Sequence, residues 1–78
     1  MKKEEYEELA DERWRKWQKK TEHYGDELWR KYSINLTLTL AEHRLLEVVR
    51  VFRETGYLDR DNLIDAMNFC DMVRMKAK

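Results

Sequence analysis

The heptapeptide INLTLTL, residues 34–40, alternates apolar and polar side chains. Its apolar members are Ile34, Leu36, Leu38 and Leu40. A repeat of two residues is typical of a β-strand, whereas a helix repeats every 3.6 residues. A strand by itself is unstable, because its backbone donors and acceptors need a neighbouring strand. The pattern therefore raises the question of a partner, and a second copy of the chain can supply one.

The size of the chain favours self-association. A chain of 78 residues forms one domain at most, and it buries only ~60% of its unfolded surface. Cys70 is the only cysteine, so no disulfide can stabilise the domain within one chain, and we expect this residue in the apolar core. His23 and His43 lie too far apart in sequence to form a structural zinc site with it. We therefore expect a homodimer.

The charges are balanced in number but separated along the chain. Residues 1–12 carry six acids against two lysines, whereas residues 13–31 carry seven bases against three acids. A basic segment is compatible with nucleic-acid binding, although it is also typical of a solvated helix face. No apolar run is long enough for a signal peptide or a membrane span, so we expect a cytoplasmic protein with no membrane partner.

The first 32 residues are predicted to form a helical arm. Residues 3–22 have the spacing of an amphipathic helix. Its apolar stripe consists of Tyr6, Ala10, Trp14, Trp17, Thr21 and Tyr24. Gly25 ends this helix, and Asp26 is expected to cap a short turn over residues 27–32.

Two further helices are expected after the strand. Thr39 and Glu42 form a capping pattern, and the helix that they begin should end near Thr55, before Gly56. Its apolar face is Leu45, Val48, Val49 and Phe52, flanked by Ala41 and Val51. Leu46 lies off this face, and the aromatic arm is expected to cover it. A last helix should run from the cap Asp59 to about Met75. Its buried face is Leu63, Ala66, Met67, Cys70 and Val73, with a polar stripe of Asp61, Asp65 and Asn68.

The order strand, helix, glycine turn, helix resembles the ribbon-helix-helix DNA-binding family. The similarity covers residues 33–70 and includes "ETG" at the end of one helix and "LDRDNLIDA" at the start of the next. The expected fold is thus mainly α with one short strand. It is a ribbon-helix-helix-like β-α-α homodimer, residues 33–78, with an added N-terminal amphipathic helix, residues 1–32.

The resemblance implies a function and a set of DNA contacts. The outward residues of the paired strands would read base edges in the major groove, and the start of the last helix would contact a phosphate. Carried over to this chain, the DNA-binding residues are Asn35, Thr37, Thr39 and Arg60, with Ser33 beside them. The implied protein is a small dimeric transcription regulator of a phage or prokaryote that needs no cofactor.

A second resemblance points to another chemistry. The stretches "HYGDELW", residues 23–29, and "DNLIDAMNF", residues 61–69, are similar to small phage proteins related to the all-helical MazG-type nucleotide pyrophosphohydrolases. Those enzymes hold Mg²⁺ against a triphosphate with carboxylates on two facing helices. This alternative implies a metal site at Glu47, Asp61 and Asp65. A third alternative is a non-catalytic protein-binding module, an inhibitor or adaptor.

Overall fold

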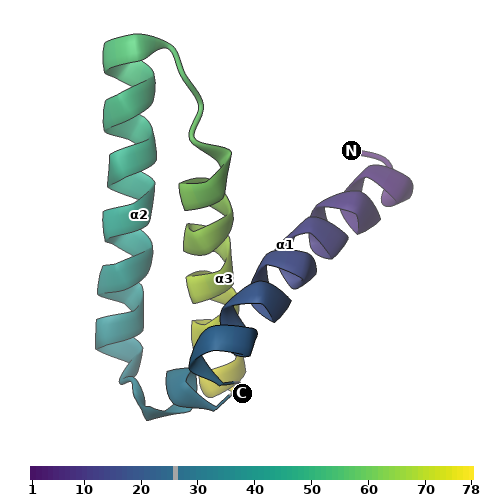
Figure 1. The fold of residues 1–78 in the computed structure, drawn as a ribbon, viewed down its shortest axis with the longest axis vertical. Helices are drawn as coiled ribbons and strands as arrows, with labels where there is room; N and C mark the ends of the chain where they lie inside the picture. Colours follow the sequence, from purple (N-terminus) through teal and green to yellow (C-terminus); the bar gives the residue numbers. More distant parts are fainter. Residues whose placement is uncertain (26) are drawn as a thin grey trace.

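The protein is a bundle of three α-helices with one short 3₁₀ helix. The computed structural model describes residues 1–25 and 27–78. In chain order the elements are α1 (Lys3–Tyr24), η1 (Leu28–Lys31), α2 (Ile34–Thr55) and α3 (Arg60–Lys76). α2 and α3 form an antiparallel hairpin, α1 crosses in front of α3, and the N-terminal half of α1 extends away from the hairpin (Figure 1). The Cα radius of gyration is 13.4 Å, whereas about 11.5 Å is expected for a compact chain of this length.

The strand predicted over residues 34–40 is wrong, because this segment is the first part of α2. The described residues contain no strand with which it could pair. A helix satisfies its backbone groups within the segment, so it needs no partner. The two threonines also bond back into the helix: Thr37 Oγ1 donates to Ser33 O at 2.8 Å, and Thr39 Oγ1 donates to Asn35 O at 3.0 Å. The ribbon-helix-helix fold and its strand-paired homodimer are therefore wrong as well.

The helix ends follow local capping chemistry. α2 begins one residue after Ser33, whose Oγ accepts a hydrogen bond from Leu36 N at 3.0 Å, so the predicted cap at Thr39 is wrong. The predicted end is confirmed, because α2 stops at Gly56 with φ of 75°, a left-handed conformation that suits glycine. The predicted cap of α3 is also confirmed: Asp59 Oδ1 accepts from Asn62 N at 3.1 Å.

The core is small, and among the described residues its buried members all come from α2 and α3. Its buried apolar residues are Ala41, Val48, Ala66 and Met72, and its buried polar residues are Thr37, Asp65 and Asn68. Four residues expected in the core lie outside it. Leu45 is 48% exposed, Phe52 is 52% exposed, and Met67 and Cys70 are exposed as well. Val48 is buried as predicted. The buried side of α2 is nevertheless rotated from the predicted face toward Thr37, because α3 packs on that side.

The arm packs against α3 and leaves the outer side of α2 open. Leu46, which Trp14 and Trp17 were expected to cover, is 57% exposed, and both tryptophans instead line a cavity with α3 residues. α1 has no buried residue, and residues 1–9, which include its first two turns, are all exposed. Asp26, the expected cap of the following turn, lies outside the described residues.

Candidate ligand-binding site

A buried carboxylate joins α1 to α3. Asp65, 7% exposed, faces two lysines that stand one turn apart on α1. Its Oδ1 lies 3.2 Å from Lys16 Nζ and 2.7 Å from Lys20 Nζ. This oxygen is fully buried and has no aligned hydrogen-bond partner, so the two ion pairs are what compensates its burial. One carboxylate thus holds two cations.

Two more polar contacts hold the same seam. Arg13 Nε lies 3.2 Å from Asp71 Oδ2, and Asn68 Nδ2 donates to the backbone oxygen of Arg13 at 3.3 Å. The polar stripe predicted on the last helix therefore exists, but at Asp65 and Asn68 it is buried beneath α1. Because α1 is held mainly by such contacts, side chains do not fill the whole seam.

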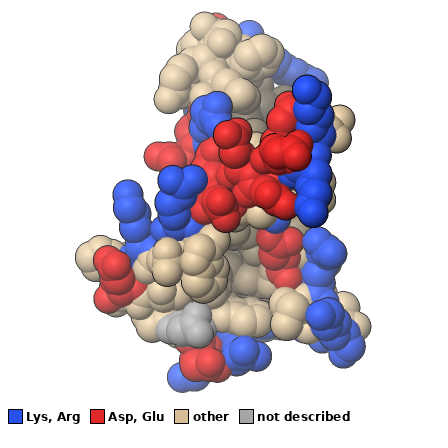
Figure 2. Space-filling model, turned by 90° about the vertical axis from the view of Figure 1, so that its right-hand side faces the viewer, with Lys and Arg blue, Asp and Glu red and all other residues tan. Residues whose placement is uncertain are grey.

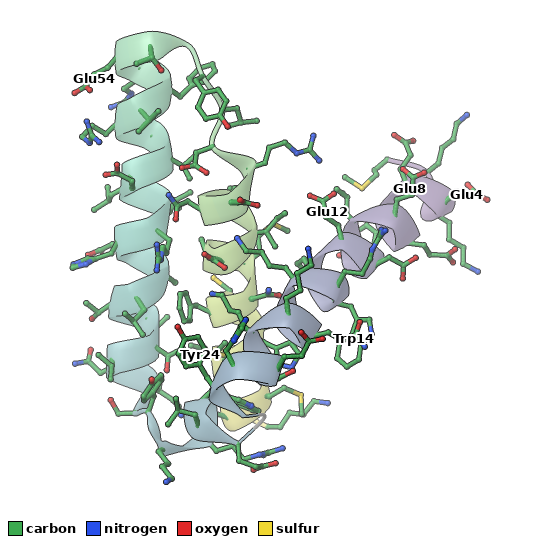
Figure 3. The ribbon with its side chains drawn as sticks, in the orientation of Figure 1. Glu4, Glu8, Glu12, Trp14, Tyr24 and Glu54 are labelled. Atoms are coloured by element: carbon green, nitrogen blue, oxygen red, sulfur yellow. The ribbon has the colours of Figure 1, made fainter. Side chains whose placement is uncertain are left out.

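One cavity lies at the C-terminal end of α1, with η1, α2 and α3 around it. Its volume is about 380 Å³, within the range of small-molecule sites. We call it the aromatic pocket, because five aromatic residues line it: Trp17, Tyr24, Trp29, Tyr32 and Phe69. In the view of Figure 3, the Tyr24 side chain lies on the side of α1 nearer α2, and Trp14 lies on the opposite side. The rings of Trp17 and Trp29 meet edge to face, with centroids 6.1 Å apart.

Among the described residues that line the aromatic pocket, the charged side chains have one sign. They are Lys20 and Arg44, and no carboxylate is among these lining residues. Lys20 Nζ lies 5.4 Å from the centre of the Phe69 ring. Arg44 Nη1 donates to Asn62 Oδ1 at 2.9 Å and has further donors to offer. In a chain with equal numbers of acids and bases, this lining favours an anionic ligand.

A second cavity, of about 310 Å³, lies on the other side of Trp17. Trp14 and Met75 contribute to its apolar wall. Its charged residues, Arg13 and Asp71, are paired with each other. This cavity therefore lacks the excess of positive charge that distinguishes the aromatic pocket.

The residues predicted to read DNA do not form a DNA-reading surface. Thr37 is fully buried, and the side chain of Thr39 bonds to the backbone of Asn35. Arg60 pairs with Glu12 of α1, with Nη2 and Oε2 3.2 Å apart. The helix explains this arrangement, because it turns residue 37 to the buried side, whereas residues 35 and 39, one turn apart, share another side.

Each carboxylate of the predicted metal site lies beside a lysine or arginine side chain. Glu47 Oε1 lies 2.6 Å from Arg50 Nη2, and this hydrogen bond lowers the pKa of Glu47. Asp65 is held by the two lysines, and Asp61 lies 3.7 Å from Lys16. Among the residues that the structure describes, no three histidine, cysteine or acidic side chains are placed to share a metal ion. These three carboxylates thus do not fit a magnesium site in this arrangement.

Comparison with known proteins leaves the geometry as the basis for function. No family model, curated protein or solved structure matches the chain. Within the described part of the chain, none of the helices combines the length and apolar character needed to span a membrane.

The sequence indicated part of this site. The stretch "HYGDELW" contributes Tyr24, Gly25, Leu28 and Trp29 to the pocket lining, and Trp17 was placed on the apolar stripe of the arm. Lys20 and Arg44 were missed as site residues. Nothing in their local sequence distinguishes them from other surface cations, since only packing brings them to one cavity.

Proposed function

We propose that the protein binds a nucleoside phosphate in the aromatic pocket. The observation that carries this proposal is the lining of the pocket. Its described residues include five aromatic side chains and two cations, and none of them is a carboxylate. Aromatic faces stack on a planar base, and lysine and arginine bind phosphate oxygens. The "HYGDELW" resemblance to proteins related to nucleotide pyrophosphohydrolases supports the same ligand class.

The ion pairs allow Lys20 to change partner. Lys20 and Lys16 share the Asp65 carboxylate. When Lys20 moves to a phosphate, Lys16 still compensates the buried charge, so the cost of the exchange is reduced. Arg44 gives up only one hydrogen bond, to an uncharged amide. The two cations are therefore available to an incoming anion at small cost.

The surface charge favours a mononucleotide over a polymer. Glu4, Glu8 and Glu12 follow one another along the projecting half of α1 (Figure 3). On the face seen in Figure 2, acidic side chains gather into a patch with basic ones around it. Such a patch repels the extended, negatively charged backbone of a nucleic acid. A single nucleotide in the pocket is little affected, because salt screens charges that lie more than about 10 Å away. The proposal is restricted to binding, because the carboxylates of a hydrolytic metal site are not assembled.

Tryptophan fluorescence tests the proposal, since Trp17 and Trp29 line the pocket. A Trp14→Phe background removes the third tryptophan. We expect nucleoside triphosphates to change the emission saturably, and the nucleoside without phosphate to bind more weakly. Lys20→Gln and Arg44→Gln should each lower the affinity for the phosphate roughly tenfold, the value of one charged hydrogen bond.

Lys19→Gln is the matched control, because Lys19 is exposed on the same helix and is absent from the pocket lining. It should bind like the parent. Two results would contradict the proposal: no saturable response to any common nucleotide, or equal losses in the Lys19 and Lys20 variants. A response to oligonucleotides but not to mononucleotides would also contradict the proposal, because the ligand would then be a single-stranded nucleic acid.

A further inference from the structure

The α2–α3 hairpin exposes an apolar stripe that nothing in the described chain covers. On α2 the stripe consists of Ile34, Leu38, Leu45, Val49 and Phe52. Four of these residues are at least 42% exposed, and Val49 is half-buried. α3 adds Leu63 and Met67 beside Cys70, of which Met67 is 37% exposed. We call this set the outer face.

The outer face is turned away from α1. Along α3, Asp65, Asn68 and Met72 lie toward α1, as their contacts with α1 and its cavities show. At 100° per residue, Leu63 and Met67 lie about half a turn from that side. α1 can therefore cover the pocket side of the hairpin but not the outer face, and the ligand proposal does not account for this surface.

The exposed area is larger than a compact monomer requires. The accessible surface is 6308 Å², whereas a folded monomer of this mass exposes about 5,100 Å². The excess, about 1,200 Å², exceeds the ~800 Å² that each partner buries in a stable protein interface. The projecting half of α1 supplies part of this excess, and the outer face supplies exposed apolar area. The excess is therefore large enough for an interface with a partner of similar size.

The spacing on α2 is that of a helix that packs against a second helix. Residues 34, 38, 41, 45, 48 and 52 are separated alternately by four and three positions, the repeat of a helix–helix seam. Ala41 and Val48 are already buried against α3. The remaining members of the repeat stay exposed in the single chain.

The charges beside the stripe select an antiparallel second copy. Glu42 and Arg53 are eleven residues apart, three helical turns, so they lie on one line along the edge of the stripe. Both are exposed, and neither has an ion-pair partner in the described part of the chain. Two α2 helices related by an antiparallel twofold bring each Glu42 to the Arg53 of the other copy, so both pairs are satisfied at once.

We propose that the outer face binds a second copy of this chain, with α2 antiparallel to α2 about a twofold axis, to give a four-helix bundle of two hairpins. The interface buries the stripe, and the two Glu42–Arg53 pairs fix its direction. The helical arms lie on the two outer sides of the bundle, so each pocket stays open. This dimer uses helices where the sequence had indicated paired strands.

Charge reversal tests both the partner and the direction. Sedimentation equilibrium of the full chain should give twice the 9.7 kDa chain mass. Glu42→Arg or Arg53→Glu alone places like charges together twice, and each should weaken the dimer roughly tenfold. The double variant should restore the parent affinity. A mixture of the two single variants should form a heterodimer, because both contacts then join opposite charges.

Leu45→Glu and Leu46→Glu provide a pair that does not depend on the charge pairs. Leu45 is on the stripe and Leu46 is off it, and circular dichroism checks that each variant is folded. The Leu45 variant should be a helical monomer and the Leu46 variant a dimer. A parent chain that is monomeric at all concentrations would overturn the proposal. So would a mixture of the single variants that associates no better than either alone.

Discussion

The α2–α3 hairpin and the arm α1 are built on different physics. Among the described residues, all of the buried ones belong to α2 or α3, and none belongs to α1. The hairpin is held by apolar contact and by a helix cap at Ser33 and another at Asp59. The arm is held by ion pairs that centre on Asp65 and by partial burial of Trp17. A helix can therefore be long and amphipathic and still be the weaker part of a bundle.

This difference places the proposed binding site at the weaker contact. Both cavities lie along the seam between α1 and α3. Regions with little buried apolar surface open at lower free energy than the core. A ligand that enters the aromatic pocket therefore meets the part of the molecule that can adjust to it, while the hairpin stays folded.

The largest expected effect comes from the hairpin core. Val48→Asp places an unpaired charge at a site that is 5% exposed, which costs about 3 kcal/mol or more. That is a large share of the stability of so small a domain, so thermal melting followed by circular dichroism should show loss of the folded state. Leu46→Asp, at an open site on the same helix, is the control and should melt close to the parent. Equal losses would mean that α3 does not pack on the Val48 side of α2.

A smaller effect, confined to the arm, is expected from Asp65→Asn. The neutral amide loses both ion pairs, but the two lysines can be hydrated in the open seam, so the cost is about 1–2 kcal/mol. Amide hydrogen exchange should accelerate in α1 and change little in α2. Asp61→Asn is the matched control, because the Asp61 side chain is 88% exposed. If exchange rises equally in all three helices, the arm and the hairpin are one cooperative unit.

The smallest effect is expected at the surface of the hairpin. The hydrogen bond from Arg50 lowers the pKa of Glu47 below its ordinary value of 4.5. The carboxylate therefore stabilises the fold above that ordinary pKa, and the contribution is lost as the pH falls through the lowered value. Glu47→Gln should cause a slight drop in Tm at neutral pH and none at strongly acidic pH. A difference that persists after the carboxylate is protonated would show that packing, and not charge, explains it.

The helix boundaries could be predicted because their causes are local. Gly56 ends α2 by adopting a left-handed conformation, and Asp59 begins α3 by capping it, as their positions in the sequence indicated. The strand prediction failed on the same principle. Seven alternating residues fit a strand or the start of a helix, and Ser33, a local cap just before them, decides for the helix.

The candidate site was predictable only in its aromatic part. The spacing of Trp17 and Tyr24 placed both on one side of the arm, and both line the pocket. Lys20 and Arg44 are 24 positions apart on different helices, so no sequence pattern relates them. Asp65 was expected in an open polar stripe. Its carboxylate can be buried only because α1 brings two lysines beside it, which compensate the lost hydration.

Local sequence patterns were enough to predict that the chain is helical over most of its length, where α2 ends, where α3 begins, and that aromatic residues line one side of the arm. These properties depend on backbone geometry and on side chains within a few positions of one another. Which side of α3 the arm covers, and which apolar stripe stays open, follow from the packing of the three helices. That choice depends on the balance between burying apolar area and pairing the Asp65 charge, and this balance exists only when α1 and α3 are in contact.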